Sequence, residues 1–219
     1  MTKRLKQFLL CFTLVVFGPV SAGSYEDFFN ALDADNAAVV TQLLERGFDP
    51  NTPNPKGVAA LLVALKDSAP NAARALIRDP NLVVEVRNAQ DESPLMLAAL
   101  RGYLDICIQL IARDADVNKP GWAPLHYAAT ESHIPVMQLL IDNHAYLDAA
   151  SPNGTTPLMM AAMYGNTSAV KLLLEAGADP TLKNHLGLTA IDFAERVKKS
   201  DSTTVIAAFI RARRPKGAW

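Results

Sequence analysis

Cysteine and histidine are the most reactive side chains of this 219-residue chain, and neither occurs in a catalytic pattern. The two cysteines are Cys11 and Cys107. No histidine and acid lie at a spacing from Cys107 that would activate its thiolate. We therefore predict an inert, buried thiol at Cys107, with a redox or catalytic thiol as the alternative.

The four histidines are too dispersed to form a metal site. His126, His133, His144 and His185 show none of the paired spacings that zinc sites use. The chain also lacks a phosphate-binding glycine loop, an activated serine motif and a metalloprotease signature. The sequence therefore predicts no catalytic residue, no metal and no cofactor. A chain of this kind acts through the surface that its elements present.

One short phrase recurs along the chain at nearly constant spacing. Each clear copy places Pro-Leu shortly before an alanine pair, and these copies occupy residues 93–99, 123–129 and 156–162. Degraded copies begin at Ala59 and Thr189. The five starting positions are 34, 30, 33 and 33 residues apart, a period typical of stacked supersecondary units.

A second pattern recurs in register with this repeated phrase. An apolar pair such as Leu110-Ile111 follows twelve residues after the first alanine of each copy, and a turn follows the pair. Ser93 suits a helix N-cap and Pro94 the first helical position. Each unit is therefore predicted to be two short antiparallel helices with a protruding turn. Cys107 falls where other units carry Val40, Ala73, Met137 and Val170, a small core position.

These phrases and turns, with the segment 173–179, closely resemble the ankyrin repeat over about residues 24 to 215. The resemblance implies an all-α solenoid of about six helix-turn-helix units, with short hairpin fingers and a concave groove that binds proteins. Residues 23–219 form the expected repeat domain. The expected repeats are 24–53, 54–87, 88–118, 119–150, 151–183 and 184–215.

The chain departs from the family pattern in three places. Only His126 keeps the family's histidine, which implies a ring that bridges a turn and the neighbouring repeat; Leu62, Met96 and Met159 replace it elsewhere. We therefore expect few polar bridges between repeats. Three residues are missing between Asn118 and Trp122, which predicts a shortened finger. Extra residues at 198–203 predict an atypical closing repeat.

The first 22 residues have a different character. Lys3, Arg4 and Lys6 precede an apolar run at 8–20, and small residues end at Ala22. This order is typical of a secretory signal peptide, and the run is short for a membrane span. We predict cleavage after Ala22 and a periplasmic or secreted protein without stable membrane insertion. An uncleaved anchor is the alternative.

Charge argues against nucleic acid as a partner. The formal net charge is −1, from 21 basic and 22 acidic residues. Cleavage after Ala22 would leave 18 basic residues and a net charge of −4, whereas nucleic-acid binding needs a basic stripe. The residues after 210 are basic, and we interpret them as a solvated terminus, with a membrane or anion contact as the alternative. They are Arg211, Arg213, Arg214 and Lys216.

The family resemblance also indicates which positions meet a partner: finger tips, the residue before each phrase, and the two residues after each alanine pair. Trp122, Tyr164 and Arg101 are the expected anchors, because aromatic and arginine side chains dominate interface energetics. Trp122 has an alternative role as a hydrophobic cover over the shortened finger. The remaining expected contacts are Met163, Glu131, Lys66, Leu100, Thr155 and His185.

These observations favour a non-enzymatic, exported, monomeric protein that binds one protein partner through its groove. Small exported bacterial ankyrin proteins resemble this chain, and some are associated with catalase and oxidative-stress defence. That resemblance implies protection or recruitment of a periplasmic enzyme. An inhibitor or immunity protein against a toxin or enzyme, and a host-directed effector, are the alternatives.

Overall fold

The computed structural model describes residues 22–213, so the expected signal peptide lies outside the described residues except for Ala22. Within this range the secondary structure is helical, apart from one isolated antiparallel bridge between Pro53 and Ala59. The twelve helices of the described range are α1 (Ala22–Asp33), α2 (Ala37–Glu45), α3 (Ala60–Lys66), α4 (Pro70–Arg78), α5 (Pro94–Arg101), α6 (Leu104–Ile111), α7 (Pro124–Glu131), α8 (Ile134–Asp142), α9 (Pro157–Met163), α10 (Thr167–Ala176), α11 (Ala190–Arg196) and α12 (Ser200–Arg213).

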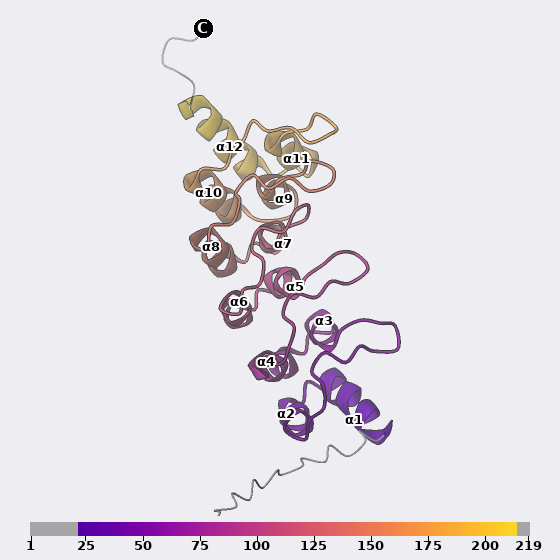
Figure 1. The fold of residues 1–219 in the computed structure, drawn as a ribbon. Coiled ribbons are helices and arrows are strands. Elements are labelled where there is room, and N and C mark those ends of the chain that lie inside the picture. Colours follow the sequence, from indigo (N-terminus) through magenta and orange to yellow (C-terminus); the bar gives the residue numbers. More distant parts are fainter. Residues whose placement is uncertain (1–21, 214–219) are drawn as a thin grey trace, which may run out of the picture.

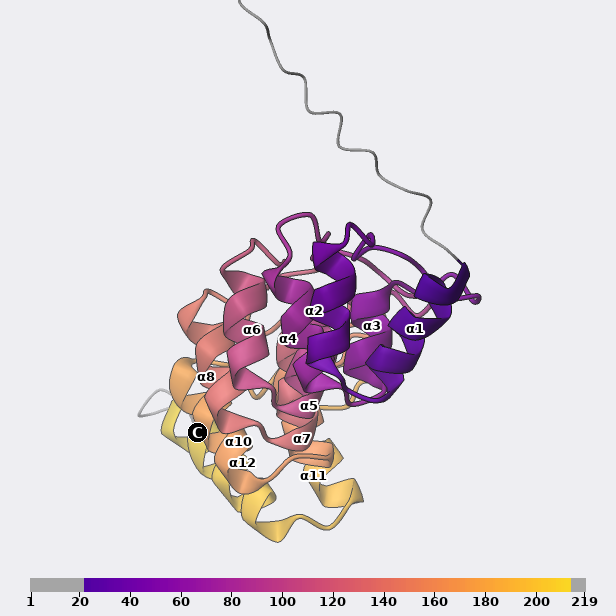
Figure 2. The same cartoon turned by 90° about the horizontal axis from the view of Figure 1, so that it is seen from below.

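Consecutive helices pair, and the six pairs stack into one elongated body (Figure 1). The odd-numbered helices form an inner row, from which the loops protrude, and the even-numbered helices form an outer row. Seen along the stack, successive pairs are displaced to one side, so the body is curved (Figure 2). The predicted all-α solenoid of about six units is confirmed.

The repeated phrase forms the start of each inner helix for simple local reasons. The Ser93 hydroxyl accepts a hydrogen bond from the Met96 amide at 3.2 Å, and Pro94 then occupies the first helical position, where no amide proton is needed. The helix ends at Gly102, whose φ of 71° is the left-handed conformation that glycine tolerates. Thr156 caps α9 in the same way, at 3.3 Å.

The core runs the length of the stack as one cluster of apolar side chains. The alanine pairs are fully buried; Ala98 and Ala99 are each 0% exposed, which lets neighbouring inner helices approach closely. The apolar pairs fill the space between the two rows, and Leu110 is likewise fully buried. Burying such a leucine stabilises the fold by about 1.5–3 kcal/mol. A single pair of helices could not bury these faces, so stability depends on the stacking of neighbours.

Cys107 lies in this core with 0% exposure. Burial, with a smaller effect from the charge of Asp105, raises the pKa of its thiol to about 12. The thiolate is the reactive form, so a thiol held protonated at neutral pH is a poor nucleophile. The predicted burial of Cys107 in the core is confirmed.

His126 bridges two repeats as the family resemblance implies. Its Nδ1 accepts a hydrogen bond from the Ala123 amide at 3.1 Å, and its Nε2 donates to the Thr155 carbonyl at 2.9 Å. At the same place in α5 and α9, the sulfurs of Met96 and Met159 accept from the amides of Ser93 and Thr156 at 3.3 and 3.4 Å. The methionine sulfurs thus provide the local cap that His126 provides in α7. In the described range, no hydrogen bond from these methionines to the next repeat is found.

Polar contacts between repeats are nevertheless more numerous than we expected from the missing histidines. Arg101 donates to the Lys66 carbonyl at 2.7 Å, and His133 donates to the Leu100 carbonyl at 3.0 Å. The most extensive bridge is made by the Arg113 guanidinium, which reaches one repeat back to four carbonyls. These belong to Ile77, Asp79, Pro80 and Leu82.

The loops before α3, α5 and α11 share an asparagine finger. In each, the side-chain oxygen of an asparagine accepts hydrogen bonds from the amides two and four residues later, which closes a hairpin. The loop before α9 uses Ser151 and Asn153 for the same purpose. Figure 1 shows the loops leading into α3 and α5 projecting well beyond the inner row. The three asparagines are Asn54, Asn88 and Asn184.

The loop before α7 is shortened as predicted. Asn118 donates to the His144 carbonyl and accepts from the Tyr146 amide. Asn51, in the first repeat, makes the equivalent bonds to the Asn81 carbonyl and the Val83 amide. Asn51 lies eight residues before its helix cap, Ala59, whereas Asn118 lies five before Ala123, so three residues, including the finger asparagine, are missing.

The last repeat differs from the others. Its outer helix, α12, has 14 residues and is the longest in the described range. Arg213 at its end donates to the Ala178 carbonyl at 3.2 Å.

Among residues 22–213, no helix combines the length and apolar character that crossing a membrane would require.

Candidate functional site

A hollow of about 260 Å³ opens on the inner row beside the shortened loop. It spans three repeats, because its walls come from α5, the loop before α7, α7 itself and α9. We call it the central hollow. Its lining residues are Leu100, Trp122, His126, Tyr127, Thr130 and Met160.

The position of Trp122 is compatible with both of the roles weighed from the sequence. Its indole packs edge-on against the His126 ring, with centroids 5.2 Å apart and planes at 75°. This contact covers the buried imidazole that joins repeats, yet the indole is only half-buried and lines the central hollow. An aromatic ring held by such a contact can receive a partner's side chain with little loss of conformational freedom.

His126 forms the neutral part of the hollow's wall. Its ring is 0% exposed, and burial lowers the pKa of the imidazole below the usual 6.5. Because Nδ1 accepts the Ala123 amide proton, the ring proton must sit on Nε2, which donates to Thr155. The imidazole is therefore an uncharged structural group in the hollow at neutral pH.

Tyr127 is a lining residue that sequence reasoning missed. Its hydroxyl donates to Glu92 Oε1 at 3.0 Å, and the other oxygen of Glu92 accepts from Asn88 Nδ2 at 2.7 Å. Burial and the Glu92 charge raise the pKa of Tyr127, so the phenol stays protonated. The sequence did contain a signal for this position. The fifth residue of the phrase varies from Leu97 in α5 to Tyr127 and Met160 in the next two units, and the last two both line the hollow.

Five of the predicted contacts form a line at the ends of the inner helices. Each is the last residue of its helix, or the residue after it, so equivalent positions recur from repeat to repeat. We call this line the rim; it comprises Lys66, Arg101, Glu131, Met163 and Tyr164.

The rim residues differ in how available they are. Tyr164 is 56% exposed, and Lys66 and Glu131 are also exposed. Met163 is half-buried against the core. Arg101 is exposed, but its guanidinium is committed to the Lys66 carbonyl, which gives it a structural role beside any contact with a partner.

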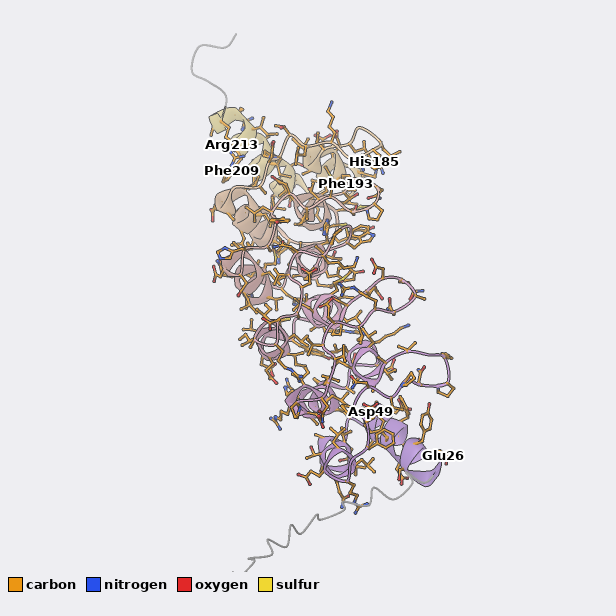
Figure 3. All side chains as sticks on the ribbon, viewed as in Figure 1. Glu26, Asp49, His185, Phe193, Phe209 and Arg213 are labelled. Carbon is orange, nitrogen blue, oxygen red and sulfur yellow. The ribbon has the colours of Figure 1, made fainter. Side chains whose placement is uncertain are left out.

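The other predicted residues have different environments. Leu100 is half-buried and lines the central hollow with Trp122. His185 is exposed on the last finger, well away from the first repeats (Figure 3), and its amide donates to the Asn153 carbonyl at 3.0 Å. Thr155 was expected to contact a partner, but its side chain is buried, with only 3% of the residue exposed. Its amide bonds to Ser151 Oγ and its carbonyl accepts from His126, so this residue belongs to the repeat junction.

The central hollow and the rim together present a surface suited to binding. In the described range, no three His, Cys, Asp or Glu side chains gather in a way that could hold a metal ion. The central hollow presents apolar walls with two hydroxyls, and both are already engaged: Thr130 donates to the His126 carbonyl at 2.8 Å, and Tyr127 donates to Glu92. A hollow of this kind accommodates an apolar side chain.

Comparison with known proteins agrees with the repeats seen in the structure. A family model described as ankyrin repeats in three copies matches residues 28–120 and 110–184. The chain is 41% identical over 90 residues to mouse (Mus musculus) ankyrin repeat and SAM domain-containing protein 6, covering 41% of the chain and 10% of that protein.

Two further relatives match in the same way. The nuclear factor NF-kappa-B p105 subunit of Gallus gallus is 30% identical over 178 residues, covering 78% of the chain and 18% of that protein. The neurogenic locus notch homolog protein 1 of Xenopus tropicalis is 36% identical over 119 residues, covering 52% of the chain and 5% of that protein. The chain thus corresponds to less than a fifth of each of these three relatives. The family model covers most of residues 22–213, and the chain belongs to the ankyrin-repeat family.

Proposed function

We propose that this protein is a non-enzymatic binding module that holds a protein partner against the central hollow, the rim and the fingers. Ankyrin repeats are a protein–protein interaction module, which supports the class of function. The observation that carries the proposal is the central hollow itself. It gathers apolar side chains from three repeats around the half-buried Trp122, and such aromatic pockets dominate the energetics of protein interfaces.

The partner's chain is expected to place one apolar side chain in the hollow. A hollow of about 260 Å³ has room for a leucine, methionine or phenylalanine side chain, and its polar groups are already satisfied. Tyr164, which is 56% exposed on the rim, would then contact the partner outside the hollow. Burial of a large apolar side chain contributes about 1.5–3 kcal/mol.

The module acts outside the cytoplasm in this proposal. Support comes from the sequence alone: basic residues, a short apolar run and small residues that end at Ala22. Protection or recruitment of an exported enzyme, as in oxidative-stress defence, is the role we propose there. Mass spectrometry of the native protein tests the location, because an N-terminus at Gly23 is expected and retention of Met1 would contradict it.

Affinity capture from the native exported fraction tests the binding surface. We expect one dominant partner to be captured by the wild-type chain and lost by a Trp122→Ala, Tyr164→Ala double variant. Arg101 is left intact, because its bond to the Lys66 carbonyl would confuse binding with folding. The matched control is Ile108→Ala on the outer row, where the side chain is 48% exposed. Equal capture by the double variant would contradict the proposed surface.

A further inference from the structure

A second and larger hollow, of about 400 Å³, lies at the opposite end of the stack from α12, between α1 and α3. One face of α1 provides an aromatic wall of Tyr25 and Phe29, whose ring centroids are 4.9 Å apart. The finger before α3 closes one side with Pro55, and the Tyr25 hydroxyl donates to the Pro53 carbonyl at 3.1 Å. We call this cavity the α1–α3 hollow.

The α1–α3 hollow is acidic as well as aromatic. Glu26, Asp33 and Asp67 line it, all three are exposed, and no ion pair is found for them within residues 22–213. Asp33 ends α1, where the partial negative charge of the helix adds to that of the carboxylate. The nearby lysines, Lys56 and Lys66, do not line the hollow. A cationic segment that also carries an apolar or aromatic side chain would complement this surface.

The other end of the same chain has that composition. Residues 211–219 contain four basic residues and no acidic one, and they include a proline and Trp219. Arg213 is committed to the Ala178 carbonyl, whereas Arg211 is exposed beside it. The remaining charges, Arg214 and Lys216, lie beyond the described residues and are known from the sequence only.

Geometry excludes a contact within one molecule. Figure 3 shows Glu26 and Arg213 at opposite ends of the stack. Helices pack with axes about 8–10 Å apart, so six stacked pairs separate the two ends by about 40–50 Å. The six residues that follow Arg213 span at most about 20 Å even when fully extended. They could reach an α1–α3 hollow only in another molecule.

We propose that residues 214–219 of one copy dock in the α1–α3 hollow of a second copy. The basic side chains meet the three carboxylates, and Trp219 packs against the wall of Tyr25 and Phe29. The contact is head-to-tail, so the two surfaces differ and association can continue beyond a dimer, in contrast to the monomer expected from the sequence. It uses neither Trp122 nor the rim, and it is therefore independent of the proposed partner site.

Sedimentation velocity of the protein as isolated from its producing cell tests this proposal. Self-association is expected in the micromolar to millimolar range at low salt. Raising the salt from about 0.01 M to about 1 M shortens the Debye length from about 30 Å to about 3 Å, and should weaken association at least tenfold. A protein that stays monomeric throughout this range at low salt would overturn the proposal.

Two variants identify the surfaces, and far-UV circular dichroism confirms that each remains folded. The hollow variant neutralises the carboxylates, and the tail variant removes the basic and aromatic side chains. Each alone should associate at least tenfold more weakly than the wild type. A control that neutralises three exposed carboxylates elsewhere should associate normally. The hollow variant is Glu26→Gln, Asp33→Asn and Asp67→Asn; the tail variant is Arg214→Ala, Lys216→Ala and Trp219→Ala; the control is Glu45→Gln, Glu175→Gln and Glu195→Gln.

Mixing the hollow variant with the tail variant tests directly whether the contact is head-to-tail. The hollow variant keeps an intact tail and the tail variant keeps an intact hollow, so the mixture should form a one-to-one dimer that neither protein forms alone. Wild-type association without such complementation would overturn the head-to-tail contact. Trp122→Ala should associate like the wild type, which separates this test from that of the partner site.

Discussion

The loop that leads into α5 is three residues longer than the loop that leads into α7, and the two loops present different features on the inner row. In the first, Asn88 accepts from the amides of Gln90 and Glu92 at 3.0 and 2.9 Å and closes a finger. In the second, no such asparagine is present, and Trp122 lies over His126 at the edge of the central hollow. One loop presents a finger, and the other presents a hollow.

The shortened loop is held by a different set of contacts. Lys119 is only 7% exposed; its ammonium pairs with Asp91 of the preceding finger and donates to the Pro120 carbonyl at 3.0 Å. In α7, His126 Nε2 donates a hydrogen bond to the Thr155 carbonyl and so joins this helix to the next loop. The comparison teaches that the stack tolerates loss of a finger where contacts to both neighbouring repeats, with the Asp91 carboxylate on one side and the Thr155 carbonyl on the other, replace its local hydrogen bonds.

Replacing His126 should have the largest effect on stability. His126→Ala leaves the Ala123 amide and the Thr155 carbonyl without this partner and opens a cavity, so we expect a loss of about 2–4 kcal/mol. His126→Met keeps the local cap, as Met96 and Met159 do, and should lose about half as much. Urea unfolding measures both. Unchanged stability in His126→Met would show that the bridge to Thr155 contributes nothing, and equal losses for the two variants would show the same of the local cap.

Removing a finger asparagine should have a smaller effect. Asn88→Ala deprives two amides of their acceptor, for an expected loss of about 1–2 kcal/mol. Lys119→Met, on the other side of the comparison, removes a charge that meets an exposed carboxylate and should cost less. Thermal unfolding of the two variants measures the order. A greater loss for Lys119→Met would show that the shortened loop depends on its ion pair.

Acid should narrow the stability difference between the wild type and His126→Met. Burial lowers the folded-state pKa of His126 below 6.5, so the unfolded chain binds the proton more readily. The stabilisation from the neutral ring is complete above pH 6.5 and is lost as pH falls through the folded-state pKa. Urea titrations between about pH 7.5 and 5 measure this change, and the other three histidines are common to both proteins. A constant difference would contradict the neutral, buried assignment.

Restoring the missing finger should have the smallest effect on stability. The segment from Lys119 to Ala123 aligns with the one from Thr52 to Ala59 if Asn-Pro-Lys is inserted between Pro120 and Gly121. We expect the inserted asparagine to close a finger and stability to change by less than about 1 kcal/mol. Affinity for the captured partner should fall, because the new finger stands beside the central hollow. Unchanged affinity would separate the missing finger from binding.

Much of the fold could be predicted because repetition exposes it. The phrase, the apolar pairs and the caps at Ser93 and Thr156 agree in spacing, and the position of Cys107 follows from that spacing alone. The three-residue loss before Trp122 was also visible. Each is a property of position along the chain, which the period determines.

The candidate site was less predictable because it depends on where side chains reach. The four-carbonyl contact of Arg113 joins residues more than 30 positions apart, and no local pattern marks it. Thr155 was expected at the surface, but its backbone bonds draw it into the junction. Tyr127 lies within the repeated phrase, but its hydroxyl bonds to Glu92, 35 residues away, and no local pattern marks this contact.

Site-specific photo-crosslinking tests the central claim, that the inner row binds a protein partner, most directly. A photoreactive residue is placed at Tyr164 on the rim or at Ile108 on the outer row, positions that are 56% and 48% exposed and thus similarly accessible. We predict that one protein of the native exported fraction crosslinks from position 164 and not from 108, and that Trp122→Ala abolishes the crosslink. Equal crosslinking from both positions, or a crosslink that survives Trp122→Ala, would contradict it.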